Sequence, residues 1–196
     1  MTRDSKFDRH TALLIVDVQN DFLPGGALAV PRGDEVVPLL NRAIDAAGRG
    51  GAPVFASRDW HPENHCSFRA RGGLWPPHCV AGTPGAAFAP TLALPRDAVV
   101  IGKATTADAD AYSAFAGTDL AARLRALGVR RLVVGGLATD YCVLNTVRDA
   151  LKEGFEVALL EDAIRAVDVK PGDGERARQA MRAAGATPAT VEDIAP

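Results

Sequence analysis

The sequence predicts a single α/β domain whose doubly wound parallel sheet carries helices on both faces. Short apolar segments alternate along the chain with longer segments of helical periodicity, and such alternation is typical of parallel strands joined by helical crossovers. The chain has 196 residues, of which 47% are hydrophobic, enough for one substantial core. It contains no internal repeat and no low-complexity linker. We therefore expect residues 1–196 to form one domain.

The elements follow from apolar runs and from their boundary residues. Ala12–Val16 is wholly apolar, which is typical of a strand buried on both faces. Asp34 is a candidate N-cap for the first helix and Gly48 a candidate end, and Thr118 is a candidate cap for the second. We expect strands at residues 12–16, 53–57, 99–101, 129–135 and 155–160, an edge strand at 187–191, and helices at 35–48, 118–127, 140–153 and 175–184.

Residues 60–96 are rich in proline and show little periodicity. A segment of this length without regular structure, inside a compact domain, usually has a functional role. The polar residues that could take part in catalysis or metal binding lie in this segment or at the ends of the expected strands. In an open parallel sheet the carboxyl ends of the strands form the binding site. We therefore expect one site at that edge of the sheet.

Composition excludes several classes of protein. The net charge is −2 with both signs spread along the chain, so no basic stripe indicates nucleic-acid binding. No apolar run approaches the length of a membrane span, and the N-terminus has no apolar signal core. Three cysteines, an odd number, argue against a disulfide framework. We expect a cytoplasmic protein that binds a small molecule, and the sequence leaves its oligomeric state open.

Cys142 follows an expected buried strand and the turn Gly-Gly-Leu-Ala-Thr-Asp-Tyr. This places its thiol at a helix N-terminus, where free N–H groups and the helix dipole favour the thiolate. A nucleophile on a strand-to-helix turn suits acyl transfer. The alternative is a small buried cysteine that contributes only to packing.

Asp17 and Lys103 follow two other expected strands. Burial at the end of a strand would raise the pKa of Asp17 and suit it to acid–base chemistry, although it could instead cap the following loop. Lys103 could keep a neighbouring carboxylate ionised and lower the pKa of a thiol, or it could be an exposed lysine. Asp21 reads as a local hydrogen-bonding residue.

Asp59, His61, His65 and His78 form a candidate metal site, because carboxylate oxygen and imidazole nitrogen suit zinc, manganese or iron(II). Asp59 and His61 are two residues apart, so they point the same way from an extended segment. Two different structures would also account for these residues. One is a structural zinc site that includes Cys66 and Cys79, and the other is a set of hydrogen-bonding surface histidines.

These motifs together resemble the nicotinamidase branch of the isochorismatase-like cysteine hydrolases, from about residue 12 to residue 160. The resemblance rests on Asp17, Lys103 and Cys142 with the segments Asp-Trp-His-Pro-Glu-Asn-His (59–65) and Trp-Pro-Pro-His (75–78). It implies a six-stranded parallel sheet and an Asp–Lys–Cys triad. It also implies one divalent metal held by Asp59, His61 and His78, with His65 close by as a possible further ligand.

The resemblance further implies the substrate contacts. Phe22 and Trp75 would flank a pyridine ring, and Leu137 would be a further contact. The Leu137–Ala138 peptide bond would be cis, so that the N–H groups of Ala138 and Cys142 form an oxyanion hole. One departure is Ala104, which stands where many relatives have glycine. Alanine suits that position unless its φ is positive.

The activity that the resemblance implies is hydrolysis of nicotinamide to nicotinate and ammonia through a cysteine thioester, in NAD salvage. Within the same superfamily, a carbamoyl or aliphatic amidase and an isochorismate-type vinyl ether hydrolase are alternative functions. Outside it, the chain could be a non-catalytic module that binds a metal or a partner. A redox-sensing thiol protein is a further candidate, although no second cysteine lies at CxxC spacing.

Overall fold

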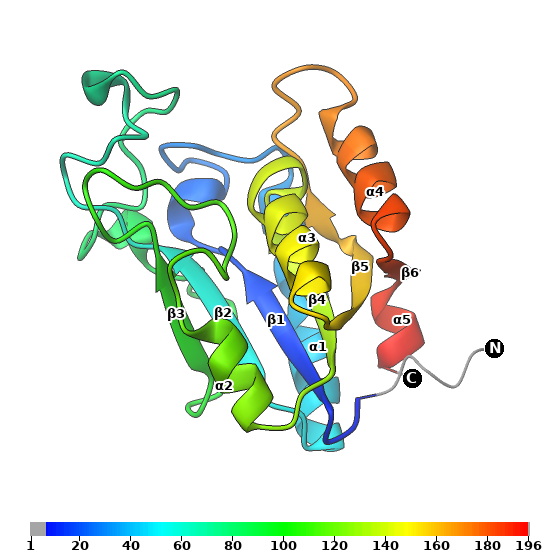
Figure 1. Cartoon of the computed structure of the whole chain (residues 1–196). Helices are drawn as coiled ribbons and strands as arrows, with labels where there is room; N and C mark the ends of the chain where they lie inside the picture. Colours follow the sequence, from blue (N-terminus) through cyan, green and yellow to red (C-terminus); the bar gives the residue numbers. More distant parts are fainter. Residues whose placement is uncertain (1–6, 196) are drawn as a thin grey trace.

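The computed structural model describes residues 7–195, which form one parallel sheet of six strands with helices on both faces (Figure 1). This confirms the expected fold class. The strands are β1 (Thr11–Val16), β2 (Val54–Asp59), β3 (Val99–Lys103), β4 (Arg131–Leu137), β5 (Glu156–Arg165) and β6 (Thr187–Ala189). The α-helices are α1 (Val36–Gly50), α2 (Leu120–Ala126), α3 (Leu144–Lys152), α4 (Asp173–Ala183) and α5 (Val191–Ile194).

The strand order is β3-β2-β1-β4-β5-β6, and every pair is parallel. The chain starts in the middle of the sheet, runs outward through β2 to β3, and returns to β4 on the other side of β1. The order therefore reverses between β1 and β4. In doubly wound sheets a crevice opens at the carboxyl ends of two such strands, and ligands bind there.

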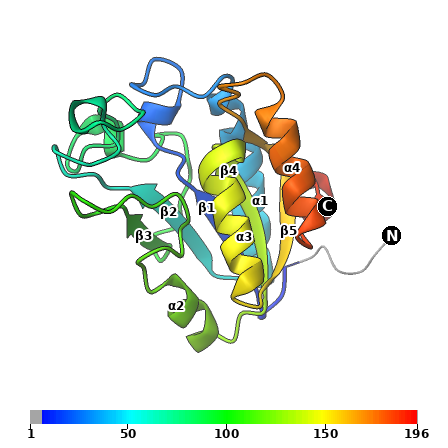
Figure 2. The ribbon, with the colours of Figure 1, turned by 45° about the horizontal axis from the view of Figure 1, so that its top comes forward.

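Both faces of the sheet are covered, and the sequence of β1 shows why. Leu13 and Ile15 belong to the core cluster beneath α1 and α5. Leu14 and Val16 point to the opposite face and pack in the cluster with α2, α3 and α4. Successive side chains of a strand alternate between faces, so a wholly apolar strand requires two covered faces. Figure 2 shows α3 in front of the sheet and α1 behind it.

Several boundaries differ from the expected ones. Helix α1 begins at Val36, because residues 33–35 form a 3₁₀ turn in which Asp34 makes no cap. Helix α2 begins at Leu120, although Thr118 Oγ1 still accepts a hydrogen bond from the N–H of Leu120 (3.3 Å). Strand β5 continues to Arg165 through an irregularity in its pairing with β4. The expected last strand is only three residues long and precedes a short helix, α5, which the sequence pattern did not indicate.

Residues 60–98 contain no α-helix and no named strand, which confirms the expected irregular segment. The first part of this segment and the first part of the loop after β3 gather above the carboxyl ends of β1, β2 and β3, at the upper left of Figure 1, and both then return to the opposite end of the sheet, where β3 and α2 begin. The sheet therefore supplies a rigid floor and the loops supply the walls of the site. Within residues 7–195, no helix is long and apolar enough to cross a membrane.

We expect Gly136→Ala to lower the free energy of unfolding by more than about 3 kcal/mol, because it adds both overpacking and backbone strain. Gly136 has a φ of 129°, and a Cβ there would lie 2.1 Å from the carbonyl oxygen of Val16 in the neighbouring strand. Gly48 is the matched control. It lies in α1 with nothing within 4 Å of an added Cβ, so Gly48→Ala should stabilise by about 0.5–1 kcal/mol. Urea unfolding measures the free energy of unfolding of both variants. Equal values would contradict the close contact described for Gly136.

Candidate active site

Asp17 lies directly after β1, at the point where the chain leaves the sheet with a φ of 49°. Its side chain is fully buried. Ser57 Oγ donates a 2.7 Å hydrogen bond to Oδ1, and Oδ2 lies 3.0 Å from Lys103 Nζ. Burial raises the pKa of Asp17, although Lys103 opposes the rise. Asp17 is therefore a fixed carboxylate with one oxygen turned toward the centre of the site, and its affinity for a proton is increased.

Lys103, the last residue of β3, places a buried ammonium group at the centre of the site. Its Nζ is ion-paired with both Asp17 and Asp59. It also donates to the Ala111 carbonyl at 3.0 Å and to Cys142 Sγ at 3.5 Å. Burial lowers the pKa of Lys103, but the carboxylates of Asp17 and Asp59 outweigh burial and hold that pKa well above its ordinary value. The ammonium therefore stays charged.

Cys142 lies in a π-helical turn, residues 139–143, that joins β4 to α3. The expected effect of Lys103, which lowers the pKa of the thiol, is present, but the expectation that this pKa is lowered overall is wrong. Burial raises the pKa of Cys142 well above its ordinary value, and the charges of Asp17 and Asp59 raise it further, whereas Lys103 alone lowers it. The resting group is thus a thiol beside a carboxylate whose pKa is also raised. A proton can pass from Sγ to Asp17 without leaving this cluster.

The turn before Cys142 has the backbone form that the resemblance implied, because the Leu137–Ala138 peptide bond is cis. The Ala138 carbonyl accepts hydrogen bonds from the N–H groups of Tyr141 and Val143, both at 3.1 Å. Ala138 and Cys142 both line the pocket described below. Their backbone N–H groups as an oxyanion hole stay a prediction.

Asp59, His61 and His78 form a buried group whose candidate ligand atoms all lie within 4.8 Å of one another. Asp59 is the last residue of β2, and the two histidines come from the irregular segment that follows it. His61 Nδ1 donates to the His78 carbonyl at 3.0 Å, and His78 Nδ1 donates to the Pro76 carbonyl at 2.8 Å. Each hydrogen bond leaves the Nε2 lone pair free, and such outer contacts orient histidines that bind metals.

Burial keeps both imidazoles neutral, which is the form that binds metals. It lowers the pKa of His61 to about 3 and lowers the pKa of His78 in the same direction. The residue types and burial therefore fit a divalent ion of the zinc, manganese or iron class.

His65 lies beside this group and not within it. Its ring stacks on that of His61 with centroids 4.2 Å apart. Nδ1 is 2.7 Å from Ser67 Oγ, and Nε2 faces the carbonyl oxygen of Ala109 at 3.2 Å, so both nitrogens are engaged. His65 as a fourth ligand stays a prediction. In the part of the chain that the structure describes, neither Cys66 nor Cys79 belongs to a candidate metal group, so the thiolate zinc site is not formed.

One pocket is lined by Cys142 of the triad and by Asp59 and His78 of the metal group. Phe22 and Trp75 line it, whereas Leu137 is fully buried in the core and is not among the lining residues, so its role as a substrate contact stays a prediction. Five further residues line it, and four of them, Leu28, Val30, Tyr112 and Val167, come from loops, where the sequence offers no periodicity that would indicate them. Only Tyr141 could have been expected at the pocket from the sequence, because it directly precedes the candidate nucleophile. The complete lining is Phe22, Leu28, Val30, Asp59, Trp75, His78, Tyr112, Ala138, Tyr141, Cys142 and Val167.

Aromatic contacts join two walls of the pocket. Trp75 Nε1 donates a 3.0 Å hydrogen bond to Tyr112 Oη, and the Trp75 ring meets Tyr141 edge to face with centroids 5.1 Å apart. The loop that carries Tyr112 begins at Ala104, whose φ is 51°. The departure from glycine therefore does fall at a left-handed position, where an alanine is strained.

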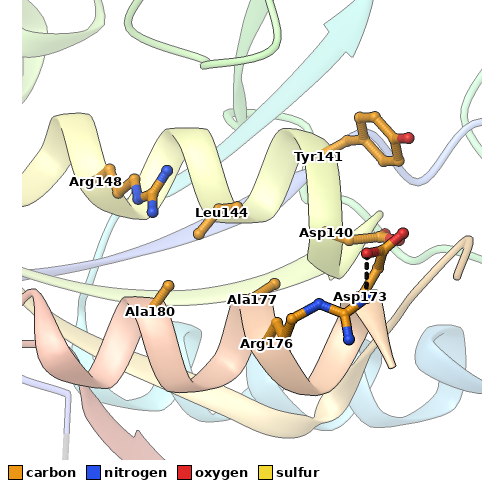
Figure 3. A pocket seen from close by; sticks show the side chains of 8 residues that line it. All are labelled: Asp140, Tyr141, Leu144, Arg148, Asp173, Arg176, Ala177 and Ala180. Atoms are coloured by element: carbon orange, nitrogen blue, oxygen red, sulfur yellow. Dashed lines mark hydrogen bonds and ion pairs between the residues drawn. The ribbon is translucent and has the colours of Figure 1, made fainter. Parts of the chain in front are cut away.

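A larger groove, of about 340 Å³, lies between α3 and α4 and is distinct from this site. Arg148 and Leu144 border it from α3, and Arg176, Ala177 and Ala180 from α4 (Figure 3). Arg176 is ion-paired with Asp173 at its rim. The groove contains neither a nucleophile nor a candidate metal ligand set, and only Tyr141 is shared with the smaller pocket. The candidate reactive groups therefore lie at the pocket beside Cys142 and not at this groove.

Comparisons with known proteins show which family the chain is similar to. Residues 11–193 match the model of the isochorismatase domain family. The chain is 43% identical to a nicotinamidase of Escherichia coli K12 over 93% of this chain and 95% of the relative. A pyrazinamidase of Pyrococcus horikoshii, solved in complex with zinc, superposes with a TM-score of 0.89 at 54% identity, covering 92% of this chain and 99% of that one.

An L. infantum protein solved in complex with nicotinate also superposes with a TM-score of 0.89, at 38% identity over 96% of this chain and 97% of that one. The match to the family model spans all six strands and the loops that carry the site. The sequence match, the parallel sheet and the cluster at the ends of its central strands together show that the chain belongs to the isochorismatase family.

Proposed function

We propose that this protein is a nicotinamidase, which hydrolyses the carboxamide of nicotinamide to nicotinate and ammonia. One observation carries the proposal. Cys142, Asp17 and Lys103 form a single buried cluster, and the pocket above that cluster is also lined by Asp59 and His78 of the candidate metal group. An amidase nucleophile and a group suited to a ring nitrogen thus face the same space. The relatives named nicotinamidase and the homologue in complex with nicotinate support this choice of substrate.

The reaction divides between the residues of the cluster. Asp17 takes the proton of Cys142, and Sγ attacks the amide carbon. The backbone N–H groups of Ala138 and Cys142 hold the oxyanion that develops. Asp17 then returns the proton to the leaving ammonia and next activates a water molecule that cleaves the thioester. Lys103 stays charged throughout and stabilises the carboxylate and thiolate forms of its two neighbours.

Asp59, His61 and His78 would hold one divalent ion, with zinc supported by the homologue that was solved with it. When bound, such an ion supplies a positive centre that attracts and orients a pyridine nitrogen.

The pocket walls bear on the choice among amides. Phe22 and Trp75 offer aromatic surfaces for a flat ring, and Trp75 is itself held by its hydrogen bond to Tyr112. These walls favour an aromatic amide over an aliphatic or carbamoyl one. Ammonia release from a panel of amides separates these substrates.

A redox sensor and a non-catalytic binding module fit the structure less well. The reactive thiol of a redox sensor is exposed and has a lowered pKa, whereas Cys142 is buried and its pKa is raised. A non-catalytic binding module has no need for a buried Asp–Lys–Cys cluster. The role in NAD salvage is part of the same proposal, because it follows from the proposed reaction, whose products are nicotinate and ammonia.

Cys142→Ala should lower kcat by at least about 10³-fold, because no other group in the pocket can form the thioester. Nicotinamide should still bind, which calorimetry can measure. Cys66→Ser is the matched control. Its thiol is only partly buried and lies outside the pocket, so most of the activity should remain. Turnover near the wild-type rate in Cys142→Ala would disprove the nucleophile.

Asp17→Asn should lower kcat by about 10² to 10⁴-fold, because the amide keeps the shape of the carboxylate and cannot take the thiol proton. Stopped-flow measurement of the first turnover locates the loss in thioester formation. The control is Asp45→Asn on the exposed face of α1, which should leave kcat unchanged. An Asp17→Asn variant within a few-fold of wild type would refute the role of Asp17 as proton carrier.

His61→Ala and His78→Ala should each lose most of the bound metal, together with the activity, since each removes one of three ligands. His65→Ala should retain more metal, because both nitrogens of His65 contact protein groups. Elemental analysis after dialysis against metal-free buffer gives the metal content. A loss in His65→Ala as complete as in His61→Ala would promote His65 to a ligand. Full occupancy in His61→Ala would exclude the site.

A further inference from the structure

Gln19 is a fully buried polar residue that takes no part in the reaction described above. Its side-chain amide is completely used. Oε1 accepts the N–H of Asp59 at 2.7 Å, and Nε2 donates to the carbonyl oxygens of Asp59 at 2.8 Å and Ala86 at 2.9 Å. One side chain therefore holds both backbone polar groups of Asp59, a residue 40 positions away in the sequence.

The topology explains why this contact exists. Strands β1 and β2 pair only as far as Val16 and Ser57, because Asp17 leaves the sheet with a positive φ. Beyond Ser57, β2 therefore has no strand beside it on the side of β1, and the backbone groups of Asp59 lack a strand partner there. The amide of Gln19 has the donor and acceptor of a peptide group, and it takes the place of the missing backbone. An apolar residue here would leave the N–H and carbonyl of Asp59 buried and unpaired.

Asp59 is the residue whose orientation matters most to both halves of the site. Its Oδ1 contacts Lys103 Nζ and lies 3.8 Å from His61 Nε2. A carboxylate shared in this way must be held in one direction, and that direction follows from the backbone of Asp59. Gln19 fixes this backbone on one side, and pairing with β3 fixes it on the other.

Asp21 makes the corresponding contact on the histidine side. Its Oδ2 accepts the N–H of Cys79 at 2.7 Å, and Cys79 directly follows His78 with a φ of 46°. Gly85 lies so close to this carboxylate that a Cβ on Gly85 would be 2.2 Å from Oδ2. The carboxylate is therefore enclosed by the loop that it holds.

We propose that Gln19 and Asp21 are positioning residues that orient Asp59 and His78 for metal binding. The inference rests on the proposed metal site of Asp59, His61 and His78. Both residues act through backbone groups and touch neither substrate nor metal. Residues 19–21, which follow Asp17 closely in the chain, thus contact the backbone next to two separate metal ligands, Asp59 and His78.

The test is zinc affinity, measured in the full chain by competition with a chelator and without substrate. Gln19→Met keeps the side-chain length and removes every hydrogen bond, so the zinc Kd should rise by about 10 to 100-fold. Gln19→Glu keeps the acceptor for the Asp59 N–H and should show an intermediate affinity if the protein folds. At saturating zinc the metal site is filled in both proteins. The kcat of Gln19→Met should then differ from the wild-type kcat by a smaller factor than its zinc Kd does.

Asn41→Leu is the matched control. Asn41 in α1 makes the same pair of contacts elsewhere, donating to the Thr91 carbonyl and accepting the Ala93 N–H, both at 2.8 Å. Its loss should lower the Tm and leave the zinc Kd unchanged. If Gln19→Met does not fold, Asp21→Asn is the second variant, and its zinc Kd should rise several-fold.

The inference is overturned if folded Gln19→Met binds zinc within about two-fold of wild type, or if Asn41→Leu weakens zinc binding equally. It is also overturned if wild-type protein binds no zinc. Failure of the proposed function looks different. In that case the wild type binds zinc, the variants lose affinity as described, and nicotinamide releases no ammonia.

Discussion

A single buried cation holds this active site together. Lys103 is 1% exposed, and its ammonium group contacts Asp17, Asp59, Cys142 and the Ala111 carbonyl. An isolated buried charge costs several kcal/mol or more, and so do two adjacent carboxylates without a cation. With both carboxylates ionised, one positive charge faces two negative charges. Burial, together with the charges of the two carboxylates, raises the pKa of the Cys142 thiol. The excess of negative charge also favours a further cation at Asp59.

The strand order arranges these residues in space. The strands β3, β2, β1 and β4 are adjacent in that order. β3 ends at Lys103 and β2 at Asp59, Asp17 directly follows β1, and the turn to Cys142 follows β4. Neighbouring parallel strands are about 4.8 Å apart, so their ends bring the four side chains within reach of one another. The positions are far apart in the sequence and need no further long-range contacts to meet. The loops then add only the histidines and the walls of the pocket.

The fold and the meeting of Asp17, Lys103 and Cys142 in one cluster could be predicted because strand ends follow from apolar runs and glycines. Asp17, Lys103 and Cys142 each adjoin such a run. The pKa of Cys142 could not be predicted, since its direction depends on a balance between burial and three neighbouring charges. Tyr112 and Val167 lie in loops without periodicity, so their place in the pocket could not be predicted from the sequence. Leu137 was expected at the substrate, yet its position on β4 puts it in the core.

The two halves of the site are energetically coupled, because Asp59 belongs to both. It pairs with Lys103 and stands beside His61, so a change in its charge or direction reaches the nucleophile through the ammonium group. Charges about 4 Å apart interact far more strongly in a protein interior than in water. Substitutions in the metal group and in the triad should therefore not have additive effects, since each changes the electrostatic environment of the other. In the proposed mechanism, proton transfer from Cys142 to Asp17 therefore depends on which group or ion occupies the histidine side of Asp59.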